Sequence, residues 1–253
     1  MEEFAQFARR LIDLSAGTIM QNFRKLESVD HKTDGSLVTI ADRQAEAIMR
    51  EAITKTYPAH GIIGEEFGDF QPDAEFQWTL DPIDGTINFV HGTPFFGTLI
   101  GLMQNGDPML GVLNLPVLNQ FLIGYNGETR LNGQPVHMRP CERIEDATLV
   151  SSAHWDVEQY RNMNAYEQLT KRAKLYRTWG DCYGYYMIAT GYADIMIDSY
   201  LHFWDFVPLI SIIQGAGGVI TDWYGGDIMQ TTGEKGCVAA GKSLHQLTVQ
   251  ALA

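Results

Sequence analysis

The segment LDPIDGTINF at positions 80–89 constrains the fold most, because it combines a strand end, a bend and a helix start. The apolar run before it predicts a strand that stops at its leucine, and Pro82 keeps Asp81 out of helical geometry. Gly85 permits a tight turn, and Thr86 is suited to begin a helix. Asp81 is therefore expected at the carboxyl end of a strand, where α/β proteins often bind ligands.

Strand and helix patterns alternate along the whole chain. Apolar residues at helical spacing predict helices at 1–19, 40–53, 157–174, 204–216 and from 243, with another after 180. Short apolar runs predict strands at 61–64, 76–80, 147–151, 175–179, 193–197, 218–221 and 237–240, and strands with turns at 97–125. The pattern predicts an α/β fold of stacked layers, as a single domain over 1–253 with possible lobes 1–146 and 147–253.

The composition indicates a globular protein without a membrane span. The chain has 253 residues and 45% hydrophobic content, enough for a buried core, and no run of about 18 apolar residues. The N-terminal segment does not resemble a signal peptide, and is expected to form an amphipathic helix that buries Phe4, Phe7, Leu11, Leu14 and Ile19. Three cysteines without metal-type spacing indicate reduced thiols and a cytoplasmic location.

The charge is strongly acidic, with 31 Asp and Glu against 18 Lys and Arg and a net charge of −13. This balance argues against nucleic acid as the main partner. It suits a bound cation, a cationic substrate or simple solubility, and solubility accounts for most of these charges.

Asp81 and Asp84 lie three residues apart and would repel each other unless a positive charge lay between them. Hard divalent cations such as Mg²⁺ prefer oxygen ligands of this kind, and the helix start beside them favours a phosphate group. The alternative is that both side chains only cap a turn and a helix.

Three further acids support a site, although each also fits an ordinary position. Glu65 follows a buried strand, but it also fits an ordinary solvent-exposed loop. Asp205 lies among aromatic residues at a helix start, where a charge needs a partner but where Asp also serves as a cap. Asp42 fits a plain polar position on its helix.

Taken together, these motifs resemble the inositol monophosphatase superfamily. The matching segments, in order, are GEE at 64–66, DPIDGT at 81–86, WD at 204–205 and GAGGVITD at 215–222. The resemblance covers nearly the whole chain and implies an αβαβα sandwich of the inositol monophosphatase/fructose-bisphosphatase type, usually as a homodimer. It also implies Mg²⁺-dependent hydrolysis of a small-molecule phosphate monoester.

The resemblance also implies roles for individual residues. Glu65, Asp81 and the carbonyl of Ile83 would bind one Mg²⁺, and Asp81, Asp84 and Asp205 a second, with a weaker third ion near Glu65. The amides of Gly85 and Thr86 would hold the phosphate, and Asp42 and Thr86 would orient the attacking water. Divalent ions remove the repulsion between the carboxylates and activate water, so no covalent intermediate is needed.

Other segments are similar to the histidinol-phosphate phosphatases of this superfamily. These are GEEFG at 64–68 with AEFQW at 74–78, FGTLI at 96–100 and TWGDCY at 178–183. Histidinol phosphate carries an ammonium and an imidazole, so Asp181 and Asp198 are predicted to bind these groups, with Asp84 nearby and Tyr183 over the imidazole face. Asp181 fits a helix cap equally well, and core or dimer packing is the usual role of a tyrosine such as Tyr183.

Two segments depart from that subgroup. TINFVHG at 86–92 and HFWD at 202–205 look more like inositol phosphatases, so myo-inositol 1-phosphate or a broad range of sugar phosphates stays open. A third hypothesis is a regulatory protein that binds other proteins, as one bacterial relative associated with transcription antitermination does. Because every predicted metal ligand is present, an enzyme is the better prediction.

Overall fold

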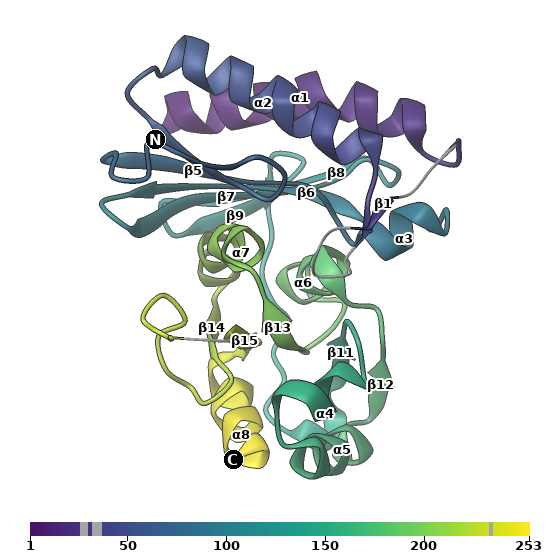
Figure 1. The fold of residues 1–253 in the computed structure, drawn as a ribbon. Helices are drawn as coiled ribbons and strands as arrows, with labels where there is room; N and C mark the ends of the chain where they lie inside the picture. The colour runs from purple at the N-terminus through teal and green to yellow at the C-terminus, as the bar shows by residue number, and fades with distance from the viewer. Residues whose placement is uncertain (26–29, 32–36, 233–234) are drawn as a thin grey trace.

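The computed structural model describes residues 1–25, 30–31, 37–232 and 235–253. These residues form an eight-stranded sheet, a five-stranded sheet and a small two-stranded pair (Figure 1). Helices cover the outer face of each large sheet and also lie between the two sheets. The order of layers is helix, sheet, helix, sheet, helix, which confirms the predicted αβαβα sandwich. No helix among the described residues is both long and apolar enough to cross a membrane.

The first sheet has the order β10-β9-β8-β7-β6-β5-β3-β4. Its strands are β3 (Gly61–Gly64), β4 (Gly68–Phe70), β5 (Phe76–Asp84), β6 (Gly97–Gln104), β7 (Asp107–Leu115), β8 (Gln120–Tyr125), β9 (Glu128–Leu131) and β10 (Gln134–Pro135). All neighbours are antiparallel except β3 and β5, which are parallel. Helices α1 (Glu2–Asn22) and α2 (Ile40–Thr56) cover the outer face, where Trp78 lies fully buried in the core. The pair β1 (Asp30–His31) and β2 (Leu37–Val38) precedes α2.

The second sheet has the order β12-β11-β13-β15-β14. Its strands are β11 (Thr148–Ser151), β12 (Leu175–Arg177), β13 (Ile195–Leu201), β14 (Gly218–Asp222) and β15 (Lys235–Gly241). Helices α6 (Asp181–Ala189) and α7 (Phe203–Gly215) lie between the two sheets, whereas α4 (Asp156–Tyr160), α5 (Met163–Arg172) and α8 (Lys242–Leu252) cover the far side (Figure 1). The chain passes from one sheet to the other between Pro135 and Thr148, near the proposed lobe boundary, through a short 3₁₀ helix at Ile144–Asp146.

A row of glycines seats α7 on the first sheet. Gly101, Gly111 and Gly124 are register partners across β6, β7 and β8. A side chain at Gly111 would overlap the carbonyl oxygen of Pro208 in α7, and one at Gly124 would meet the backbone of the same helix. The helix backbone therefore lies directly on the sheet, and this contact fixes the position of Asp205 in the first turn of α7.

Three sequence predictions about these elements are wrong. The strand expected to end at Leu80 continues to Asp84. The helix expected over 157–174 is two helices, because the side chain of Asn162 accepts a hydrogen bond from the Ala165 amide (3.2 Å) and starts a new one. Leu14 is 42% exposed, because the buried face of α1 runs through Leu11, Ser15 and Ile19.

Candidate active site

A β-bulge in β5 brings two carboxylates to the same place. Asp81 pairs with Leu99 and Asp84 pairs with Gly97, so two residues of β5 oppose the single Thr98 of β6. In a regular strand, side chains three positions apart point to opposite faces of the sheet. The extra residue of the bulge turns the side chains of Asp81 and Asp84 to the same face. Pro82 is tolerated inside the strand because a bulge does not require its missing N–H.

Two other acids arrive beside the bulge from different elements. Glu65 directly follows β3, whose last residue Gly64 is the parallel partner of Leu80, and its amide donates to the Leu80 carbonyl (3.2 Å). Asp205 is the third residue of α7 and accepts a hydrogen bond from the amide of the N-cap residue His202 (2.7 Å), so it belongs to a capping box and is not the N-cap itself. Side-chain oxygens of Asp81, Asp84 and Asp205 all lie within 4.8 Å of one another.

Burial and mutual repulsion raise the pKa values of these acids. The pKa of Asp81 is raised well above its ordinary value, first by burial and then by the charges of Glu65, Asp84 and Asp205. Burial and the charge of Asp181 raise the pKa of Asp84 to about 8. The pKa of Asp205 is also raised well above its ordinary value, by burial and by Asp84. With a pKa of about 8, Asp84 therefore keeps its proton at neutral pH when no cation is bound.

The cluster fits a divalent cation. Its donors are all oxygen atoms, and one of them, Oδ1 of Asp81, is buried and has no hydrogen-bond partner. A buried carboxylate oxygen left unbonded is costly in free energy, and a metal ion would satisfy it. The residues that would hold such an ion are Asp81, Asp84 and Asp205, with Glu65 adjacent.

These pKa values predict that the metal-free protein loses stability as pH rises. The ordinary pKa of Asp42 and Asp84 is 3.8, whereas in the folded protein the pKa is about 6 for Asp42 and about 8 for Asp84. As pH rises, the unfolded chain therefore releases these protons at a lower pH than the folded protein does. Their contribution is fully present below about pH 4 and is lost as pH rises through the folded values. We expect the free energy of unfolding to fall by about 3–5 kcal/mol between about pH 5 and pH 8, because each tenfold difference in proton affinity is worth roughly 1.4 kcal/mol.

Chemical denaturation with a chelator present measures this loss. Mg²⁺ is expected to restore most of the stability at the higher pH, because the cation replaces the protons. Stability that rose with pH in the metal-free protein would contradict the raised pKa values.

The remaining residues predicted for catalysis lie around this cluster. Asp42 is buried in the first turn of α2, where its Oδ2 accepts hydrogen bonds from the Thr39 amide (2.8 Å) and hydroxyl (2.5 Å). The Thr86 hydroxyl donates to the carbonyl oxygen of Ile83 (3.1 Å). Gly85 has a left-handed backbone, with φ of 81°, and precedes α3 (Thr86–Val90) as its N-cap. The predicted turn and helix start are therefore confirmed.

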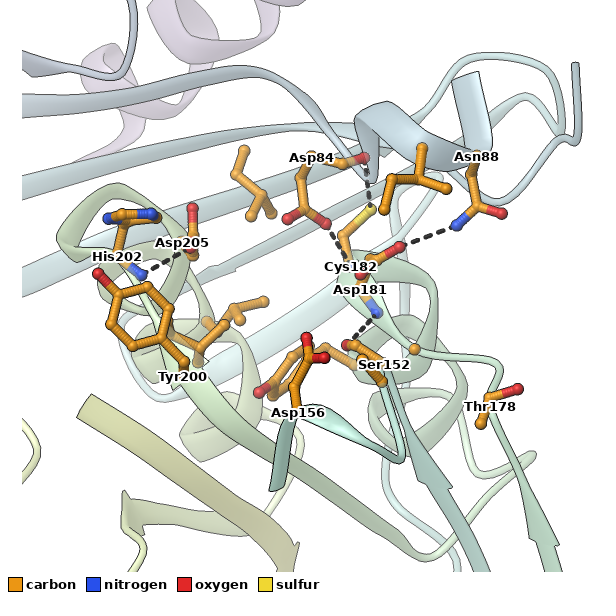
Figure 2. A pocket seen from close by; sticks show the side chains of 17 residues that line it. Asp84, Asn88, Ser152, Asp156, Thr178, Asp181, Cys182, Tyr200, His202 and Asp205 are labelled. Atoms are coloured by element: carbon orange, nitrogen blue, oxygen red, sulfur yellow. Dashed lines mark hydrogen bonds between the residues drawn. The ribbon is translucent and has the colours of Figure 1, made fainter. Parts of the chain in front are cut away.

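A cavity of about 400 Å³ opens next to the acids. Its lining includes Asp84 and Asp205 from the cluster, Asp181, Ser152 and Asn88 on one side, Tyr200 and His202 on the other, and Asp156 between them (Figure 2). Among the lining residues that the structure describes, none is Lys or Arg.

Asp181 is held in place by several bonds and does not act as the expected helix cap. Its Oδ2 accepts from the Asn88 amide group (2.8 Å), and its own backbone amide donates to the Ser152 hydroxyl (2.7 Å), as Figure 2 shows. The next residue, Cys182, donates its amide to a carboxylate oxygen of Asp84. Gly180 allows this, since a side chain there would overlap the Ser152 backbone.

Two residues predicted to bind substrate lie away from the cavity lining. Asp198 is only 4% exposed and accepts hydrogen bonds from the Tyr185 hydroxyl (2.8 Å) and the Ser152 amide (3.2 Å). Tyr183 packs against Phe95, with 4.5 Å between ring centroids. Asp198 therefore supports the wall that carries Ser152, and Tyr183 has the packing role that was its alternative.

Sequence reasoning missed several lining residues, namely Asn88, Ser152, Asp156, Tyr200 and His202. Ser152 follows the end of β11, so the rule that ligands bind beyond strand ends would have found it. Tyr200 and Asp156 carry no motif and depend on the contact between β13 and α4.

Comparisons with known proteins agree with this geometry. The model of the inositol monophosphatase family matches residues 1–253. A bifunctional phosphatase of Arabidopsis thaliana is 38% identical over 100% of this chain and 75% of its own length, and a histidinol-phosphatase of Chlorobaculum parvum is 34% identical over 87% and 86%. The structure of an inositol monophosphatase from Zymomonas mobilis superimposes with a TM-score of 0.89, at 34% identity over 99% and 98% of the two chains. The chain therefore belongs to the inositol monophosphatase family of phosphatases.

Proposed function

We propose that the protein is a Mg²⁺-dependent histidinol-phosphatase that converts histidinol phosphate and water into histidinol and phosphate. The observation that supports this substrate is the negative charge of the cavity lining. Beyond the acid cluster, Asp156 and Asp181 are its charged lining residues, and both are acidic. A substrate whose alcohol part carries positive charges gains ion pairs from such a lining, whereas a neutral polyol gains only hydrogen bonds from its hydroxyl groups. The similarity to a histidinol-phosphatase supports the same substrate.

Different residues bind the metal ions, the phosphate group and the alcohol part of the substrate. Asp81, Asp84, Asp205, Glu65 and the Ile83 carbonyl would hold two or three Mg²⁺ ions. Bound divalent cations supply charge neutralisation of the transferring phosphoryl group and activation of water. The amides of Gly85 and Thr86 bind the phosphate oxygens at the start of α3.

Water attacks phosphorus directly, the bond between phosphorus and the alcohol oxygen breaks on the opposite side, and the proton that the water loses is taken up by the leaving oxygen. Asp42 and Thr86 orient that water, and the bonds from Thr39 keep the Asp42 carboxylate in one position. Asp181 faces the alcohol group from its fixed place beside Asn88. A homodimer and a cytoplasmic location complete the proposal.

The substrate is tested by comparing kcat/KM for L-histidinol phosphate and myo-inositol 1-phosphate with Mg²⁺ present. We expect a preference of about a hundredfold for histidinol phosphate, or roughly 2.7 kcal/mol in the transition state. An equal rate, or a preference for the inositol ester, would overturn this substrate while leaving the phosphatase assignment intact. The similarity to an inositol monophosphatase makes the inositol ester the second candidate.

A further inference from the structure

A set of stacked aromatic rings borders the cavity on the side away from Asp181. Tyr200, in β13, lines the cavity and is 38% exposed. The Tyr160 ring of α4 lies nearly parallel to it, with 5.1 Å between centroids and 22° between planes. His202 meets Tyr200 edge to face at 5.0 Å and stacks on Trp204, also at 5.0 Å. The Tyr200 ring is therefore fixed from two sides while part of it still faces the cavity.

A carboxylate lies on the cavity lining between this aromatic side and Asp181. Asp156 is the first residue of α4, the helix that carries Tyr160 and packs on β13. Figure 2 shows Asp156 between Tyr200 on one side of the cavity and Asp181 on the other. The cavity thus offers two separate acidic positions beyond the acid cluster, and Asp156 is the one nearer the aromatic side.

The order of groups in the substrate assigns these two positions. In histidinol phosphate, the ammonium is on the carbon next to the CH₂–O–P group, and the imidazole is one carbon further from phosphorus. Asp181 is the inner position, because its Oδ2 lies 3.1 Å from the point where a Gly85 side chain would begin, beside the phosphate-binding turn. Asp156 and Tyr200 are more exposed and form the outer position.

We propose that Tyr200 and Asp156 form the subsite for the imidazole ring, and that Asp181 binds the ammonium; this rests on the proposed substrate. The Tyr200 ring stacks on the imidazole and attracts its cationic form. The Asp156 carboxylate accepts a hydrogen bond from a ring N–H. In this proposal the two residues take the place of Tyr183 and Asp198, which do not line the cavity.

The experiment compares two esters that differ in the ring. O-phosphoethanolamine keeps the ammonium next to the CH₂–O–P group but lacks the imidazole. We expect Tyr200→Ala to lower the ratio of kcat/KM for histidinol phosphate over phosphoethanolamine about tenfold, mainly through KM. Asp156→Asn is expected to lower it about fivefold, and Tyr200→Phe, which keeps the ring face, to restore it to within about twofold of wild type.

Matched controls lie outside the cavity. Tyr224→Ala removes another exposed tyrosine, and Glu158→Gln neutralises another exposed acid on α4; neither is expected to change the ratio. If Tyr200→Ala does not fold, Asp156→Asn at its exposed position still decides the question.

The outcomes separate the subsite from the proposed function. An unchanged ratio in both Tyr200→Ala and Asp156→Asn, in an enzyme that prefers histidinol phosphate, would overturn the subsite alone. An equal loss with both esters also leaves the ratio unchanged, so it would overturn the subsite and would show that the two residues only support the fold. A wild-type enzyme that does not favour histidinol phosphate over phosphoethanolamine would overturn the substrate and the subsite together.

Discussion

Asp81→Asn is expected to lower kcat by about a thousandfold or more and to make the metal-free protein more stable. Asp81 is the proposed ligand shared by both ions, and stabilisation of the phosphoryl group by metal is worth several kcal/mol. In the absence of metal, its Oδ1 is buried without a hydrogen-bond partner among three other acids, so an uncharged amide relieves repulsion. We expect a gain of about 1–3 kcal/mol near pH 8.

Asp194→Asn is the matched control, because Asp194 is another acid that is almost fully buried. It pairs with Arg139 and accepts from the Thr148 amide (2.7 Å), away from the cavity. This substitution is expected to cost about 1–3 kcal/mol of stability while the folded enzyme keeps its kcat. Phosphate release and denaturation with a chelator measure both variants. Near-normal turnover of Asp81→Asn with any good substrate would contradict the assignment of the metal site.

Gly111→Ala is expected to have the second largest effect, through the position of α7. A methyl group at Gly111 would overlap the Pro208 carbonyl, so the helix must move away from the sheet. Forcing extra volume into a packed core costs typically about 3 kcal/mol or less, and the upper end applies because the obstacle is backbone. Since Asp205 lies in the first turn of α7, we also expect kcat to fall at least about tenfold in the folded protein.

Gly17→Ala provides the comparison, because the space around Gly17 in α1 is open. Alanine is expected to stabilise that helix by about 0.5–1 kcal/mol and to leave kcat unchanged. Thermal unfolding and phosphate release of the two variants test the pair. A Gly111→Ala protein as stable and active as wild type would show that α7 is not seated by the glycine row.

The local structure around the acids was predictable from short motifs, whereas the grouping of Asp81, Asp84 and Asp205 came from the family resemblance. The turn and helix start after Asp84 follow from Gly85 and Thr86, and the place of Asp205 in the first turn of α7 follows from the helix pattern there. The bulge was not predictable from alternation, since it depends on the pairing of β5 with β6. The register of that pairing decides that Asp81 and Asp84 face the same site.

The residues that line the cavity were harder to predict. The position of a residue along a helix determines the face on which its side chain lies, and the sequence prediction did not use this relation. Asp181 and Tyr183 are two positions apart on α6, and residues at that spacing do not share a helix face. Tyr185, four positions from Asp181, lines the cavity with it. Tyr200 and Asp156 lie 44 positions apart in the chain and meet at the cavity only through packing of α4 on β13.

The measurement to make first is phosphate release by the wild-type enzyme as Mg²⁺ is added back after complete removal of metal by a chelator. We expect no turnover of histidinol phosphate without metal, and a rate that rises and saturates as Mg²⁺ binds the acid cluster. Asp81→Asn, measured in parallel, is expected to stay inactive over the same range. Turnover that survives chelation unchanged would contradict the assignment of Asp81, Asp84 and Asp205 as the metal site of the reaction.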